Sequence, residues 1–196
     1  VKQVRVASGM GTATLHSYAY LTPVYTGLSG NASLGDLIGY TTVTESQLDY
    51  NNNNSTILAT KHTFGTTGLD TGRETKTEWM DGTGAVKRKV TNTYVTDNTK
   101  APFPGWNFRY LYAALNYELS GSSLALTSKS IYSKDPGNGN LISQIEYLGS
   151  AVYRKTYYEY LINSNPKTYI LDKPSRVLLV NAGSQIIADT RYHYDG

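Results

Sequence analysis

Side chains suited to metal or covalent chemistry are sparse in this chain. Cysteine is absent, and the histidines are His16, His62 and His193. No two of them are four residues apart, the spacing that places two metal ligands on one helix face. The lack of cysteine also excludes a thiol nucleophile, a thiolate zinc site and a disulfide framework. We therefore expect no metal site and no cofactor.

The hydroxyl and carboxyl groups also lack the surroundings of a catalytic site. Ser29 and Ser33 lie in a Gly- and Asn-rich stretch without the Gly-x-Ser-x-Gly spacing of a nucleophile elbow. Most aspartates stand beside Gly, Pro or Asn, where a carboxylate caps a turn. A glycosidase pair could still be hidden among them, because the spatial separation of two carboxyl groups is not encoded in their sequence spacing. We expect no enzyme, with a glycoside hydrolase fragment as a distant alternative. These aspartates are Asp70, Asp81, Asp97, Asp135, Asp172, Asp189 and Asp195.

Trp79 and Trp106 are the side chains with most to offer a ligand. An aromatic body can stack on a sugar ring while its polar atom hydrogen-bonds, so a carbohydrate-binding or adhesin-type β module is the main alternative function. However, aromatic residues at two-residue spacing are more often cross-strand pairs that fix the register of a sheet. We therefore favour a structural role and keep carbohydrate as the alternative ligand.

One twelve-residue pattern occurs twice, as GSAVYRKTYYEY at 149–160 and GSQIIADTRYHY at 183–194. Each copy reads Gly-Ser, five variable residues, Thr, one residue, Tyr, one residue, Tyr. A looser copy starts at Gly84 and reaches Tyr94 one residue late. Repeated units of this size cannot bury their apolar faces without their neighbours. The motif positions are Gly84, Tyr94, Gly149, Thr156, Tyr158, Tyr160, Gly183, Thr190, Tyr192 and Tyr194.

Alternating apolar and polar residues predict the elements that carry these motifs. Turn residues separate the runs, and the 18 tyrosines favour strands. Residues 107–119 also fit a helix, but alternation favours a strand there. The sequence thus predicts an all-β fold of consecutive antiparallel β-hairpins in an extended, twisted sheet. We expect N-terminal strands and a loop at 1–39 and the hairpin repeats at 40–196. The expected hairpins are 40–64, 74–94, 141–160 and 176–194.

The charge and hydropathy of the sequence argue against a nucleic-acid partner and against a membrane span. The net charge is +3, and the densest basic run is only Lys87, Arg88 and Lys89, which predicts a solvated strand face and no nucleic-acid site. No stretch approaches the roughly 20 apolar residues of a membrane span. The first residue is Val1, and we expect a processed piece of a longer polypeptide.

The ordered set of motifs resembles the RHS or YD-repeat family, especially the divergent RHS proteins of Bacteroidetes. The resemblance rests on a Gly-Arg strand at 72–81 with an aromatic residue two positions before its aspartate, on Leu-Thr-Ser-Lys at 126–129, on the Tyr-x-Tyr units and on the closing RYHYDG. It covers about 40–196, although only the last unit carries the Tyr-Asp dipeptide. The positions that join the repeat motif by this resemblance are Gly72, Arg73, Trp79 and Asp195.

The resemblance implies a β-sheet shell that encloses or displays a polypeptide cargo such as a toxin. In that interpretation the chain is a structural segment of a large secreted or cell-surface bacterial protein. Its partners would be flanking repeats of the same polypeptide and the enclosed cargo.

Overall fold

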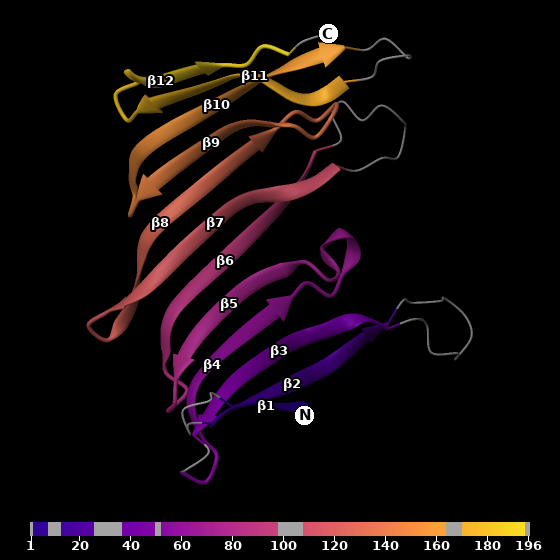
Figure 1. Ribbon diagram of the computed structural model, residues 1–196, viewed down its shortest axis with the longest axis vertical. Helices are drawn as coiled ribbons and strands as arrows, with labels where there is room; N and C mark the ends of the chain where they lie inside the picture. Colours follow the sequence, from indigo (N-terminus) through magenta and orange to yellow (C-terminus); the bar gives the residue numbers. More distant parts are fainter. Residues whose placement is uncertain are drawn as a thin grey trace. The chain divides into compact units, whose positions relative to one another are not determined.

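The described residues lie mainly in antiparallel β-strands (Figure 1). The computed structural model describes residues 2–7, 13–25, 37–49, 52–97, 108–163 and 170–194. A three-residue 3-10 helix, η1 (Gly68–Asp70), stands between two of the strands. The strands are β1 (Lys2–Ala7), β2 (Ala13–Tyr25), β3 (Leu37–Asp49), β4 (Ser55–Phe64), β5 (Glu74–Asp81), β6 (Val86–Asp97), β7 (Phe108–Ser120), β8 (Ser123–Lys134), β9 (Leu141–Leu148), β10 (Ala151–Asn163), β11 (Ile170–Asn181) and β12 (Ile186–Arg191).

The chain divides into two compact units. The first comprises Val1–Asn92 and Asn116–Ala125, and the second comprises Thr93–Leu115 and Leu126–Gly196. In the first unit, β1 through β6 pair in chain order, each antiparallel to the next. In the second, β8 through β12 do the same. Within the described residues, each unit is therefore a meander of consecutive hairpins.

Residue register decides which side chains share a face of the first unit. His16 pairs with Gln47, which pairs with Leu58. One row along, Glu45 pairs with Thr60 and Thr60 pairs with Trp79. Directly paired residues point to the same side of a sheet. Four successive strands thus place polar and aromatic side chains on one face.

Little of the described side-chain surface is deeply buried. In the first unit Leu15 and Leu48, which face each other across β2 and β3, are 9% and 8% exposed. In the second unit Ala113 and Val180 are the buried apolar residues among those described. Large apolar side chains such as Leu148 and Ile186 remain more than 60% exposed. The sheet faces therefore keep apolar surface that other chain segments or ligands can cover.

The predicted all-β class is confirmed, and each unit consists of antiparallel hairpins as expected. Residues 107–119 lie almost wholly in β7, so the preference for a strand over a helix there is also confirmed. The expected boundary between 39 and 40 falls within β3, three residues after it begins. Residues 26–36, in the N-terminal region where a loop is expected, lie outside the described residues.

Candidate functional site

The repeated tyrosines close the open ends of hairpins. The hydroxyl of Tyr160 donates to the backbone oxygen of Leu141 at 3.0 Å, where β9 begins. The hydroxyl of Tyr194 donates to the backbone oxygen of Pro174 at 2.7 Å. Each bond runs from the end of a return strand to the outgoing strand of its own hairpin. The second Tyr of the motif therefore has a structural function in both copies.

The looser copy achieves the same closure with a different side chain. In the hairpin of β5 and β6, the Asn92 side-chain nitrogen donates to the backbone oxygen of Glu74 at 3.1 Å. Tyr94, which the sequence places one residue late, is a partly exposed residue of β6 with a partner of its own. The Asn92 side chain thus makes in this hairpin a bond to the outgoing strand like those of Tyr160 and Tyr194 in theirs.

The first Tyr of the motif and the Thr before it lie within the ladder. Thr156 pairs with Leu179, and Tyr158 pairs with Val177, which in turn pairs with Thr190. Burial raises the pKa of Tyr158, and the nearby charge of Glu146 adds to this. A phenol in such surroundings is a packing group with a polar tip.

Charged side chains cross-link the strands of the second unit. Arg154 binds the Glu146 carboxylate through two nitrogens. Arg176 binds both oxygens of Asp189 at 2.7 and 2.9 Å and also reaches Glu159 at 3.1 Å. The bonds to Asp189 raise the pKa of Arg176 and lower that of the carboxyl. These pairs occupy carboxylates that would otherwise be candidates for acid and base roles.

The two motif glycines are not equivalent in backbone conformation. Gly149 has a positive φ of 57°, whereas in the second copy the positive φ, 64°, falls on Ser184. The reason is a longer turn: Asn181 N donates to Gln185 O and Ser184 N to Asn181 O. Gly84 is the structural counterpart of Ser184, with the same bonds from Asp81 N to Ala85 O and from Gly84 N to Asp81 O.

The remaining motif positions lie near turns or outside the described residues. Gly72 has a positive φ of 76° just before β5, and the Arg73 Nε donates to the backbone oxygen of Leu69. Tyr192 N donates to Ser175 O, and Thr190 is exposed on β12. Asp195 and Trp106 lie outside the described residues. The structure does not gather these positions into one site.

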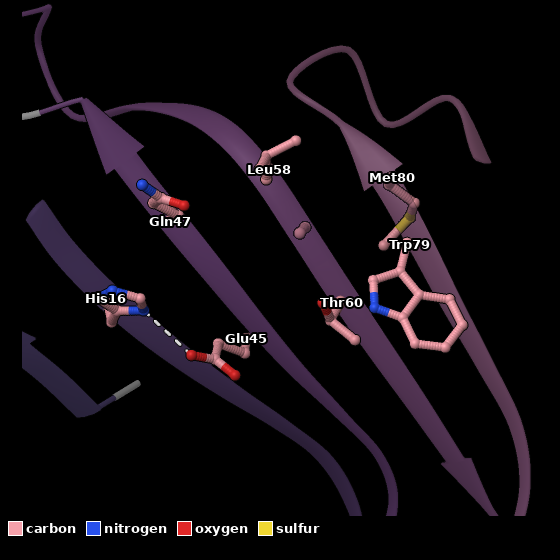
Figure 2. Close-up of a pocket in the computed structure, with 8 residues that line it drawn as sticks. His16, Glu45, Gln47, Leu58, Thr60, Trp79 and Met80 are labelled. Carbon is pink, nitrogen blue, oxygen red and sulfur yellow. Dashed lines mark hydrogen bonds and ion pairs between the residues drawn. The ribbon is translucent and has the colours of Figure 1, made fainter. Parts of the chain in front are cut away.

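A shallow depression of about 210 Å³ lies on the first unit, over β2 to β5 (Figure 2). Its polar side chains come from β2, β3 and β4, and its aromatic wall from β5. The lining residues are His16, Glu45, Gln47, Leu58, Ala59, Thr60, Trp79 and Met80. A second depression nearby involves Gly39, Tyr40, Val43, Phe64 and Gly72.

Glu45 is the centre of the polar network in the first depression. His16 Nδ1 lies 3.0 Å from Glu45 Oε1, and the Tyr18 hydroxyl donates to the same oxygen at 3.2 Å. Desolvation and then the hydrogen bond to Glu45 raise the pKa of Tyr18. Among the described contacts, Oε2 of this carboxylate has no partner. The side chain of Glu45 is 40% exposed, so its free oxygen is accessible.

Trp79, the candidate stacking residue, does line this depression. The Arg88 guanidinium carbon lies 4.6 Å from its ring centroid, a cation–π contact that steadies the ring. Arg88 does not line the depression. The indole thus presents to the depression a surface that Arg88 leaves open.

The basic run carries structural contacts. Lys87 forms an ion pair with Asp81 at 2.9 Å, and Lys89 lies over the ring of Tyr117 with Nζ 4.4 Å from its centroid. Arg88 and Lys89 are consecutive strand residues and point to opposite faces. The three cations therefore do not form one phosphate-binding patch.

Sequence reasoning identified Trp79 but not the polar side chains beside it. Alternation through Tyr40–Tyr50 already placed Glu45 and Gln47 on one face, two residues apart. The pairing with His16 and Trp79 depends on register across four strands. Among the described residues, no three His, Asp or Glu side chains come together in a group that could hold a metal ion. In the same part of the chain, no helix has the length and apolar composition that crossing a membrane requires.

Comparison with known proteins shows a likeness in structure alone. No protein-family pattern matches the chain. No curated protein matches it in sequence either. Among solved structures, it is similar to a chain in the crystal structure of TcdB2–TccC3–Cdc42, with a TM-score of 0.63 and 10% sequence identity over 89% of this chain. The match spans 13% of that chain. The likeness shows that the two chains share a fold over this segment.

Proposed function

We propose that this chain is a non-enzymatic structural segment of a larger RHS-like protein, in which its hairpins contribute to a β-sheet wall. The observation that carries the proposal is the structural likeness to TcdB2–TccC3–Cdc42, which extends over 89% of this chain and only 13% of the other. A segment matched to a small part of a much longer chain is consistent with a building unit. The repeated hairpin closures by Tyr160 and Tyr194 give such a unit its regularity.

The wall would enclose or display a polypeptide cargo such as a toxin. Few side chains in the described strands are buried, and large apolar ones are exposed on both units. Tyrosine and threonine suit a surface that packs loosely against another chain, since their polar tips stay hydrated. Flanking repeats and the cargo are the partners in this proposal, and a secreted or cell-surface location in bacteria follows from it.

The alternatives have unequal support. A carbohydrate-binding or adhesin-type module gains one observation, the position of Trp79 in a depression with polar side chains. A glycoside hydrolase needs two carboxyl groups about 5 to 9.5 Å apart around the bond that it cleaves. Of the described residues that line the depression, Glu45 supplies the single carboxylate. A structural role is thus the better proposal.

The test uses the polypeptide in its full natural length. We expect its reading frame to contain many further Tyr-x-Tyr units, and limited proteolysis to leave an enclosed region intact. Val177→Pro should admit the protease, because Val177 pairs on both sides in β11 and proline cannot donate to the ladder. Val177→Thr is the matched control and should retain protection. A reading frame without further repeats, or equal cleavage of both variants, would refute the proposal that the chain forms part of an enclosing β-sheet wall.

A further inference from the structure

The depression over β2 to β5 contains polar side chains that a structural role of the sheet does not require. A purely structural sheet face needs cross-strand packing, yet here a carboxylate, an imidazole, an amide and a hydroxyl on β2, β3 and β4 share a depression with an aromatic ring on β5. They belong to Glu45, His16, Gln47, Thr60 and Trp79. Figure 2 shows them on neighbouring strands, with the contact of His16 and Glu45 dashed.

The polar groups are arranged to receive hydrogen-bond donors. Both hydrogen bonds to Glu45 end on Oε1, which leaves Oε2 as an acceptor. In the neutral imidazole with its proton on Nδ1, directed at Glu45, Nε2 of His16 is a second acceptor. Gln47 and Thr60 each add a group that both donates and accepts. Adjacent acceptors beside mixed groups suit a ligand with several hydroxyls.

The apolar groups give such a ligand a surface to lie on. Trp79, Leu58 and Met80 line the same depression. Sites for small molecules are typically lined by apolar side chains together with a few polar groups that orient the ligand. The ring carbons of a pyranose would pack on the indole while its hydroxyls turn to Glu45 and Gln47.

Charge argues against a cationic ligand. Arg88 already lies over the indole ring, so a second cation there would meet a like charge. Glu45 is the single carboxylate of the described lining, and it already shares one oxygen with His16 and Tyr18. A neutral ligand avoids the repulsion and still uses the free oxygen.

The size of the depression suits one sugar ring. The depression measures about 210 Å³. Pockets for drug-sized molecules are larger, roughly 300–1,000 Å³. We propose that this depression binds one pyranose ring of a neutral carbohydrate. The site is independent of the wall, because a sugar subsite can exist on a wall segment or on a free-standing module.

Intrinsic fluorescence can test this directly on the whole chain. The sequence has two tryptophans, so Trp106→Phe leaves Trp79 as the reporter. The probes are methyl glycosides of glucose, galactose and mannose, with tetramethylammonium chloride as a cationic comparison. The low protein concentration that fluorescence needs also limits association through strand edges. We expect a saturable change in emission with at least one glycoside and none with the cation.

Two variants in the Trp106→Phe background distinguish the site from binding elsewhere. Glu45→Gln should weaken glycoside binding at least about tenfold, because the charged acceptor is lost. Glu159→Gln, which alters an exposed carboxylate of the second unit, is the matched control and should bind as the parent does. Trp79→Ala, measured by calorimetry because it lacks the reporter, should abolish binding. Far-UV circular dichroism checks that each variant is folded.

Three outcomes would overturn the proposal. They are no saturable change with any glycoside up to its solubility, binding of the cation in preference to the glycosides, and glycoside binding that Glu45→Gln and Glu159→Gln affect equally. None of them bears on protease protection of the full polypeptide, so this site and the proposed wall can fail separately.

Discussion

At the residue scale, the hydroxyl of Tyr160 explains why the repeat ends in tyrosine. A half-buried phenol that donates to the Leu141 carbonyl satisfies a backbone acceptor at the end of a hairpin, where ladder bonds run out. The same closure from Tyr194 to Pro174 shows that the contact belongs to the motif. Phenylalanine would fit the same space but leave the carbonyl without this donor.

Tyr160→Phe should therefore lower the free energy of unfolding by about 1 kcal/mol, the net value of one hydrogen bond. Tyr157→Phe is the control, because Tyr157 lies on the opposite face of β10 and is 40% exposed. We expect the control to change stability by less than about 0.5 kcal/mol. Urea unfolding at low protein concentration measures both. Equal losses would show that the hydroxyl bond contributes nothing specific.

Asp81 organises the turn between β5 and β6. Its Oδ1 accepts bonds from the backbone nitrogens of Thr83 and Ala85, at 2.9 and 3.0 Å, and from the Thr83 hydroxyl. Lys87 pairs with its other oxygen. The bond from Thr83, followed by that from Lys87, holds the pKa of Asp81 well below its usual range.

The depressed pKa predicts how Asp81→Asn behaves with pH. A carboxyl with a folded-state pKa below its unfolded value stabilises the fold above the unfolded value, about 3.9, and loses this effect as pH falls toward the folded value. The variant should therefore melt at a lower temperature than the parent at neutral pH. The difference should shrink below about pH 4. Thermal melting across pH measures it, and a difference that stays constant would contradict the role of the charge.

At the element scale, the sequence pattern predicted the strands better than it predicted the conformation of the turns. Alternation predicted the strands well, because each face of a strand repeats every second residue. It aligned Gly149 with Gly183, yet the left-handed position of the second turn belongs to Ser184. A longer turn moves the residue with positive φ by one position and leaves the alternation of the flanking strands unchanged.

The candidate site was less predictable than the strands for a related reason. Trp79 stood out as one of two tryptophans, whereas Glu45 and Gln47 are ordinary residues of an alternating run. Only the register of β2 to β5 brings them beside Trp79 and His16. Register depends on turn geometry and on packing between strands, and a shift of one residue would place Glu45 on the other face.

In the turn between β11 and β12 the residue with positive φ is Ser184, one position after the motif glycine, and a substitution can test the cost of this. Ser184 holds a φ of 64°, a region where side chains other than glycine cost energy. Ser184→Gly should stabilise the chain by about 0.5–1 kcal/mol, the strain relieved less the added freedom of the unfolded state. Ser150→Gly should instead destabilise it slightly, since Ser150 has no positive φ to relieve. The midpoint temperature of thermal unfolding should rise for Ser184→Gly and fall for Ser150→Gly, relative to the parent chain.

At the scale of the whole molecule, the strand edge at β12 is the feature that bears most on self-association. In the described residues β12 pairs with β11 alone, and all its side chains are exposed. Ile186 is 63% exposed. An edge with exposed isoleucines and free backbone groups is a template for another strand. In the repeat, β10 corresponds to β12 and has a neighbour on each side, β9 and β11.

The isolated chain should therefore self-associate as its concentration rises, and Ile186→Lys should reduce this association because a charge on an edge opposes strand addition. The control is Ile142→Lys, an exposed isoleucine on β9, which already has β8 and β10 as neighbours. Sedimentation velocity over a concentration series measures the effect. A parent chain that stays monomeric and melts cooperatively throughout the series would argue against edge pairing. Equal reduction by both lysines would locate the association on the sheet faces, where Leu148 and Ile186 are also exposed, and not on the edge of β12.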